Sequence, residues 1–169
     1  MFPFFSKQTW IAPTDADDRA LDALLRLHGI RNFRASELGH LPTRGWGGPP
    51  RVLPRREMWP RIVPALILLQ RVRDEIALPI RLVSTFRPKE YNDHLRSIGR
   101  GAAKRSEHIE FRAVDSRCDA LDVREYAAVV ERMCRRYDAA GVPTGFSQYG
   151  SFVHHDLGGR KRPARWATG

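Results

Sequence analysis

The sequence predicts an α+β fold in which helices come first and a small antiparallel sheet with flanking helices follows. Apolar residues recur at helical spacing in two long stretches, whereas short β-branched runs bounded by glycine or proline dominate the second half. A length of 169 residues with 42% hydrophobic content suffices for one domain with a sizeable core, and no internal repeat is visible. We therefore expect an N-terminal arm over residues 1–14 and a single domain over residues 15–169.

The first half is predicted to contain two helices separated by an irregular segment. An acidic start and an amphipathic pattern indicate a helix over residues 15–27, which Gly29 ends. Residues 32–56 are rich in glycine and proline, so they predict a long loop that borders a cleft or wraps the domain. The main core helix follows, with Pro64 in its first turn. Its apolar side chains recur at helical spacing at Ile62, Leu66, Leu69, Val72 and Ile76.

Short β-branched or apolar runs predict the strands of the sheet. They are residues 80–84, the segment FRAVDS, and the segments TGFSQY and SFVHHDL, which Gly150 joins. A helix is expected in KEYNDHLRSI behind the Arg87-Pro88 turn, followed by a basic glycine-bearing loop, IGRGAAKR. Between the second and third strands, DVREYAAVVERMCRRYDAAG predicts a long amphipathic helix that Gly141 closes.

The composition narrows the possible partners. The formal net charge of +10 attracts polyanions such as nucleic acid, acidic membrane surfaces or the anionic polymers of a bacterial envelope. Because the arginines are scattered and form no aromatic-interleaved motif, no specific nucleic-acid partner is expected. No apolar run of about 18 residues or more occurs, so no membrane span is expected. The apolar patch in the start MFPFFSKQTW is too short for the apolar region of a secretory signal. Cys118 and Cys134 are expected to fill the core.

Two polar runs occur in segments that otherwise predict buried strands. SEHIEFRAVD carries His108 and Asp115, and SFVHHD carries His154, His155 and Asp156. Alternate residues of a strand share a face, so His154 and Asp156 point one way and His155 the other. If the sheet sets the two runs side by side, their imidazoles and carboxylates suit zinc, which commonly takes three protein ligands at catalytic sites. A satisfied polar core fits the same residues.

Four separated motifs resemble, in order, the family of zinc D-Ala-D-Ala carboxypeptidases and murein endopeptidases. They are STFRPKEYN, IGRGAAKRSEHIEFRAVD, GFSQYGSFVHHDLGG and RPARW, and with the similar hexad FRASEL they cover about residues 33–166. The resemblance implies the zinc fold shared by hedgehog proteins and D,D-peptidases, a small α+β core around a single zinc site. It also implies peptidoglycan stem peptides as the substrate and a bacterial or bacteriophage origin.

Carried over residue by residue, the resemblance makes His108, Asp115 and His154 the ligands of one Zn2+. Asp156 would lie beside the metal, either as an orienting group or as the catalytic base for the bound water. A base there makes chemical sense because zinc lowers the pKa of its water to near 7, so that a nearby carboxylate can take the proton.

The resemblance also implies residues that contact the substrate. Arg87 matches an arginine that the family uses near the substrate, where a guanidinium holds a carboxylate or polarises a carbonyl group. Asn92 and Ser106 match motif positions with structural or substrate-binding roles, and Tyr149 and Phe152 are expected in walls of the core or cleft. The run over residues 160–162 is expected to be a solvated tail or a cell-wall contact. The histidines that match no motif are His28, His40 and His94.

The chain departs from the family pattern at three places. Phe111 stands where the family has glycine, which puts the local loop geometry in question. The glycine pair before the first histidine is Arg100-Gly101 here. Some relatives carry a catalytic carboxylate three residues before the last ligand, where this chain has Ser151. The alternatives to Asp156 as the base are therefore His155 and Glu110, and a bulged strand would make His155 the ligand instead of His154.

The sequence thus predicts a zinc metallopeptidase that cleaves bonds next to D-amino acids in peptidoglycan, as a D,D-carboxypeptidase or a cross-link endopeptidase. The alternative is a cell-wall-binding or structural module that holds zinc without catalysis, which Ser151 and Phe111 favour. A nucleic-acid binder, suggested by the charge of +10, is a third hypothesis. The enzyme would act on the cell wall, in the periplasm or outside the cell, and the lack of a visible export signal fits phage-type release. No oligomeric state is indicated.

Overall fold

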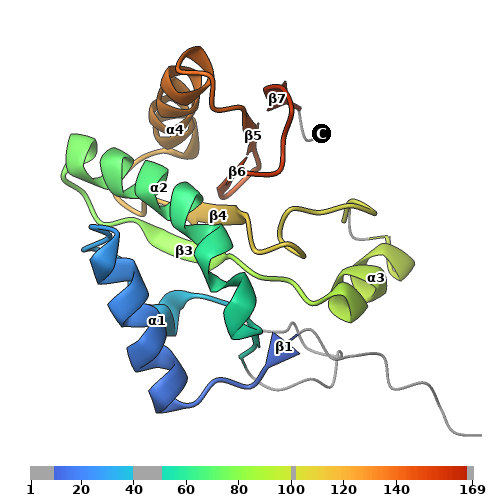
Figure 1. The fold of residues 1–169 in the computed structure, drawn as a ribbon. Helices are drawn as coiled ribbons and strands as arrows, with labels where there is room; N and C mark the ends of the chain where they lie inside the picture. The colour runs from blue at the N-terminus through green and yellow to red at the C-terminus, as the bar shows by residue number, and fades with distance from the viewer. Residues whose placement is uncertain (1–9, 40–50, 100–101, 167–169) are drawn as a thin grey trace, which may run out of the picture.

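A five-stranded sheet with two helices packed on one face forms the centre of the fold (Figure 1). The computed structural model describes residues 10–39, 51–99 and 102–166. Within these ranges the elements are β1 (Trp10–Ile11), α1 (Asp15–Leu27), η1 (Ala35–Glu37), β2 (Leu53–Pro54), η2 (Arg56–Ile62), α2 (Val63–Ile76), β3 (Arg81–Ser84), α3 (Lys89–Ser97), β4 (Ala113–Arg117), α4 (Val123–Ala139), β5 (Thr144–Gln148), β6 (Val153–Leu157) and β7 (Ala164–Arg165). The predicted α+β class is confirmed.

The strands of the central sheet lie in the order β3-β4-β6-β5-β7. Neighbouring strands are antiparallel except for β5 and β7, which run parallel, and the sequence analysis does not anticipate β7. In the β4–β6 pair, Asp115 lies opposite His154 and Val114 lies opposite His155. The sheet therefore sets the second halves of the two polar runs side by side.

Helices α2 and α4 cover the face of the sheet toward which Val114 and His155 point. On this face, Tyr126 Oη of α4 forms a 2.8 Å hydrogen bond with Ser116 Oγ of β4. Cys118 and Cys134 are buried free thiols in the same core, as expected. Figure 1 shows α2 lying across the strands, with α1 and α3 on opposite sides of the molecule. Among the described residues, no helix is long and apolar enough to cross a membrane.

The helix boundaries largely follow the sequence signals. Thr14 and Asp17 form a reciprocal capping box at the start of α1, and Gly29 follows its end with a φ of +73°. The core helix differs at its start, where Arg56–Ile62 form the 3-10 helix η2 and the α-helix begins only at Val63. Two prolines lie in this stretch, Pro60 inside η2 and Pro64 in the first turn of α2, and each lacks the N–H that a regular helix interior requires.

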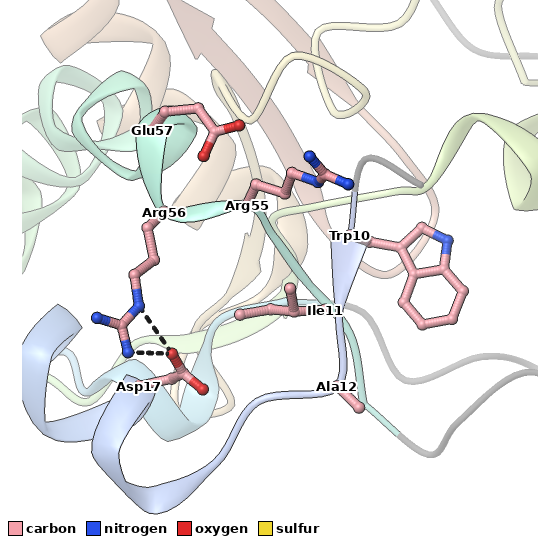
Figure 2. A pocket seen from close by; sticks show the side chains of 7 residues that line it. All are labelled: Trp10, Ile11, Ala12, Asp17, Arg55, Arg56 and Glu57. Carbon is pink, nitrogen blue, oxygen red and sulfur yellow. Dashed lines mark hydrogen bonds and ion pairs between the residues drawn. The ribbon is translucent and has the colours of Figure 1, made fainter. Parts of the chain in front are cut away.

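The described part of the N-terminal arm is paired rather than loose. β1 is antiparallel to β2, and near them Arg56 donates two hydrogen bonds of 3.0 and 2.7 Å to Asp17 Oδ1 (Figure 2). Figure 2 also shows Trp10 and Arg55 in the walls of a pocket beside this ion pair. The described parts of the segment 32–56 wrap the core, in which Phe33, Leu38, Val52 and Leu53 are buried. Residues 40–50 of this segment lie outside the described residues.

Candidate metal centre and cleft

Three side chains converge on the face of the sheet opposite to α2 and α4. His108 Nε2 lies 3.1 Å from Asp115 Oδ1 and 3.2 Å from His154 Nδ1. Asp115 Oδ1 and His154 Nδ1 are 2.8 Å apart, and all three side chains are buried. The structure thus brings together the three residues that the sequence resemblance implies as ligands.

The sheet and one turn hold these side chains in place. Asp115 and His154 are cross-strand neighbours in β4 and β6, so they project from the same face. His108 comes from a turn rather than a strand, because Ile109 N donates to Ser106 O and Arg112 N donates to Glu107 O. The expectation that His108 lies on a strand is therefore wrong, whereas the strand predicted in FRAVDS is present as β4. The turn is tied to the segment after β3, since Arg87 N donates to His108 O at 3.1 Å.

Phe111 ends this turn in the backbone conformation that glycine favours. Its φ is +55°, and a residue with a side chain pays about 1–2 kcal/mol for that left-handed conformation. The side chain is fully buried and meets the Phe86 ring edge to face, with the ring centroids 5.9 Å apart. Aromatic packing thus offsets the backbone strain, and Phe111 is compatible with the turn that carries His108.

Burial and mutual contacts shift the pKa values of all three side chains in the cluster. Burial raises the pKa of Asp115, but the charges and hydrogen bonds of His108 and His154 outweigh burial and hold that pKa well below its usual range. Burial lowers the pKa of His108. Burial also acts to lower the pKa of His154, but hydrogen bonds to Asp115 and Asp156 raise it to about 9.

Asp156 lies on the far side of the His154 ring from the converging atoms. Its Oδ2 is 3.0 Å from His154 Nε2, while Arg160 donates to both carboxylate oxygens at 2.5 and 2.7 Å. Burial raises the pKa of this fully buried carboxylate, but the hydrogen bonds from His154 and Arg160 lower it to about 2. Of the two roles that the resemblance implies, the geometry favours orientation of His154 over the role of catalytic base.

The other residues considered as the base lie away from the cluster. His155 points to the opposite face, where its Nε2 is 3.1 Å from the carbonyl oxygen of Ala65 in α2. Because β6 runs in continuous register past His154, no bulge exchanges the two histidines. Glu110 is exposed and forms an ion pair with Arg61 at 2.8 Å. Ser151 is exposed in the turn between β5 and β6.

A cleft of about 880 Å³ opens over the cluster, and Arg87 forms part of its wall. The Arg87 Nη1 atom lies 3.4 Å from Asn92 Oδ1. Asn92 is fully buried in α3, and its Nδ2 donates to the carbonyl oxygen of Ala103 at 3.0 Å. Asn92 therefore supports Arg87 and the neighbouring loop, while Arg87 itself faces the cleft.

Ser106 and Tyr149 also line the cleft. Ser106 Oγ accepts a hydrogen bond from His108 N at 3.3 Å, so its visible contact supports the turn. The Tyr149 ring stacks on Phe152 with the ring centroids 4.5 Å apart, which forms an aromatic part of the wall.

Several cleft residues are not singled out as site residues by the sequence analysis. Those with charged or aromatic side chains are Arg105, Glu107, Arg160 and Trp166. Trp166 belongs to the quoted motif RPARW, which is the sequence signal that could have revealed it. The expectation of a solvated tail over residues 160–162 is wrong for Arg160, whose guanidinium binds the buried Asp156, and agrees with the exposure of Lys161 and Arg162.

The unmatched histidines do not join the site where the structure describes them. His28 caps the end of α1, and His94 lies in α3 against the Tyr91 ring. His40 and the pair Arg100-Gly101 lie outside the described residues.

The family comparison agrees with the motif resemblance. The family model described as Peptidase M15 matches residues 49–156, which is more than half of the chain. Among solved structures, the chain is similar to the L-Ala D-Glu endopeptidase ChiX of Serratia marcescens, with 18% sequence identity and a TM-score of 0.47. That similarity covers 60% of this chain and 84% of that chain. No curated protein matches.

Proposed function

Since the chain belongs to the peptidase M15 family, we propose that it is a zinc-dependent peptidase that cleaves bonds next to D-amino acids in peptidoglycan stem peptides. The observation that carries the proposal is the convergence of His108 Nε2, Asp115 Oδ1 and His154 Nδ1 at separations of 2.8 to 3.2 Å. Catalytic zinc sites commonly combine three such imidazole and carboxylate ligands with one open position.

The donor set fits zinc in chemistry and in spacing. Ligand atoms at about 2.0–2.1 Å from a tetrahedral zinc ion stand about 3.3 Å from one another, close to the separations of 2.8 to 3.2 Å in this cluster. His108, Asp115 and His154 would hold the ion. Bound zinc supplies Lewis acidity, which polarises a peptide carbonyl and stabilises the negative charge that develops on its oxygen.

Arg87 is the residue best suited to hold the substrate beside this site. It faces the cleft, and its backbone N–H is bonded to the carbonyl of His108, so the position of its side chain is coupled to that of a proposed ligand. A guanidinium presents a planar pair of donors that matches a carboxylate or a peptide carbonyl. The hydrogen bond to Asn92 limits the motion of Arg87 before substrate binds.

A peptidoglycan substrate is supported by the motif resemblance and by the charge of the cleft. Stem peptides carry carboxylates, and two arginines of the cleft wall, Arg87 and Arg105, offer complementary charge. The stacked Tyr149 and Phe152 rings give an apolar surface for side chains such as alanine. Both D,D-carboxypeptidase and cross-link endopeptidase action fit these features. A peptidoglycan substrate would place the working enzyme at the cell wall, in the periplasm or outside the cell.

The second candidate is a module of the same family that holds zinc without catalysis. Two observations favour it: Ser151 supplies no carboxylate at the position used by some relatives, and the Asp156 carboxylate is fully engaged by His154 and Arg160. Such a module would keep the metal and bind peptidoglycan, but it would release no products.

Purified protein incubated with peptidoglycan distinguishes the two candidates. The zinc-loaded protein, the chelated protein and the chelated protein with zinc restored are compared, and released muropeptides are identified by mass spectrometry. Release that a chelator stops and zinc restores supports the enzyme. One zinc per chain with no cleavage of either cross-linked or pentapeptide substrates would favour the binding module. The masses of the products distinguish carboxypeptidase from endopeptidase action.

A further inference from the structure

Arg160 occupies a position that its sequence context does not suggest. It follows β6 in a run of three basic residues, yet its side chain is only 25% exposed, whereas Lys161 and Arg162 are exposed. Its Nε donates to Asp156 Oδ1 at 2.5 Å, and its Nη2 donates to Asp156 Oδ2 at 2.7 Å. This is the two-pronged arrangement in which a guanidinium fixes both the position and the plane of a carboxylate.

The carboxylate held by Arg160 in turn contacts His154. Asp156 Oδ2 is 3.0 Å from His154 Nε2, and the opposite ring nitrogen, Nδ1, is the atom that converges with Asp115 and His108. A partner on the far nitrogen fixes both the tautomer and the orientation of a histidine ligand. Asp156 is fully buried, so its negative charge needs a partner. The partly exposed Arg160 provides the compensating positive charge.

Trp166 closes the arrangement from the cleft side. The Arg160 guanidinium lies over the Trp166 ring at 5.2 Å from the centroid, and the Trp166 and His154 ring centroids are 5.3 Å apart. The backbone of Trp166 is held beside β5, because Ser147 Oγ donates to Trp166 O at 2.8 Å. His154, Asp156 and Arg160 thus form a row of contacting side chains, and Trp166 contacts the first and the last of them.

The strand beside β6 leaves space for this ion pair. Gly145 of β5 lies directly opposite Asp156. A Cβ at this position would overlap both the Asp156 carboxylate and the Arg160 guanidinium. A glycine here has a steric reason, since any side chain would displace the pair.

We propose that Arg160 is a positioning residue for the metal centre: through Asp156 it fixes the His154 ring in the orientation that presents Nδ1 to the ion, and Gly145 provides the space for this contact. The inference rests on the proposed zinc site. It assigns Arg160 a role through other residues and no contact with the reacting atoms. The Arg160 guanidinium is occupied by its contacts with Asp156 and Trp166, whereas Arg87 in the same cleft is proposed to contact the substrate.

Zinc affinity tests the inference without relying on peptidase activity. Metal-free protein is titrated with Zn2+ in competition with a chromophoric chelator. Arg160→Gln should weaken zinc binding by about 10- to 100-fold, as changes to outer partners of histidine ligands typically do. Arg160→Lys should recover only part of the loss, because an ammonium keeps the charge but lacks the fork. Arg162→Gln is the matched control, since it removes the same charge two residues away from an exposed site and should leave the affinity unchanged.

Two further measurements separate positioning from general stability and from substrate contact. The visible spectrum of the Co2+-loaded protein reports ligand geometry, and it should change in Arg160→Gln and not in Arg162→Gln. With muropeptide substrate and saturating zinc, Arg160→Gln should lower kcat with KM little changed. Unchanged zinc affinity with a raised KM would assign Arg160 to the substrate and overturn the inference.

Gly145→Ala keeps both charged groups and decides the matter if Arg160→Gln does not fold. It should also weaken zinc binding, because the added methyl group displaces the ion pair. Wild-type affinity in a folded Gly145→Ala or Arg160→Gln protein overturns the inference while leaving the zinc site standing. A wild-type protein that takes up no zinc overturns the metal site and this inference together.

Discussion

On β6, His154 and Asp156 point into the cleft, whereas His155 between them points toward α2. The cleft face of the sheet carries an ionic cluster, while the other face buries an apolar core in which Ser116 Oγ bonds to Tyr126 and His155 Nε2 bonds to the carbonyl oxygen of Ala65. Strand alternation alone separates these two environments. Two adjacent buried histidines thus lie in different environments, and the contrast can be tested at each face.

The largest expected difference is between the variants that remove His154 and His155. His154→Ala should weaken zinc binding by more than the roughly 100-fold that changes to outer partners cause, because it deletes one of the three proposed ligands. His155→Ala should keep one zinc per chain and lose about 1–3 kcal/mol of folding free energy, since it removes a buried hydrogen bond to Ala65 O. Elemental analysis and chemical denaturation measure the two quantities. The reverse pattern would mean that His155 is the ligand.

Arg87 tests whether the cleft face binds substrate as well as metal. Arg87→Ala should retain zinc and fold but lose about 30- to 1000-fold in turnover of muropeptides, the equivalent of about 2–4 kcal/mol of transition-state stabilisation. Lysine should restore little, because it lacks the planar pair of donors. Arg96→Ala, an exposed arginine of α3 outside the cleft, is the matched control. Full turnover in Arg87→Ala would remove this residue from the substrate site.

Phe111 tests what stabilises the turn that carries His108. Its backbone has a left-handed conformation in that turn, and its ring packs on Phe86. Phe111→Gly should relieve about 1–2 kcal/mol of left-handed strain but lose about 3–5 kcal/mol of buried aromatic packing. A net loss of about 1–4 kcal/mol follows, with zinc binding retained because the turn conformation suits glycine. Phe111→Leu keeps the strain and part of the packing. Greater stability of Phe111→Gly than of wild type would show that strain dominates.

The sequence predicts the cleft face better through its motifs than through its periodicity. Strand alternation correctly separates His154 from His155, but it also extends a strand through His108, where hydrogen bonds from Ile109 N and Arg112 N instead close a turn. Local patterns do not reveal such turns when no glycine marks them, and here Phe111 takes the left-handed position. The contact of Arg160 with Asp156 could not be predicted for a different reason. It depends on the space at Gly145, which only the register of β5 and β6 shows.

The smallest expected effect lies at α1, away from both faces, and it gives the pH test. Hydrogen bonds from Thr14 and Arg56 lower the pKa of Asp17 to about 2, from an ordinary value of 3.8. A carboxyl whose pKa is lower in the folded state stabilises the fold above its unfolded pKa, and this contribution is lost as the pH falls from about 4 to about 2. Asp17→Asn should therefore cost about 1 kcal/mol at neutral pH, as loss of a helix cap does, and almost nothing near pH 2. Guanidinium unfolding of wild type and variant across this range measures the difference, with Asp15→Asn in the same helical turn as the control. A difference that stays constant with pH would contradict the ionic origin, and a change in zinc affinity would show that α1 and the cleft are coupled.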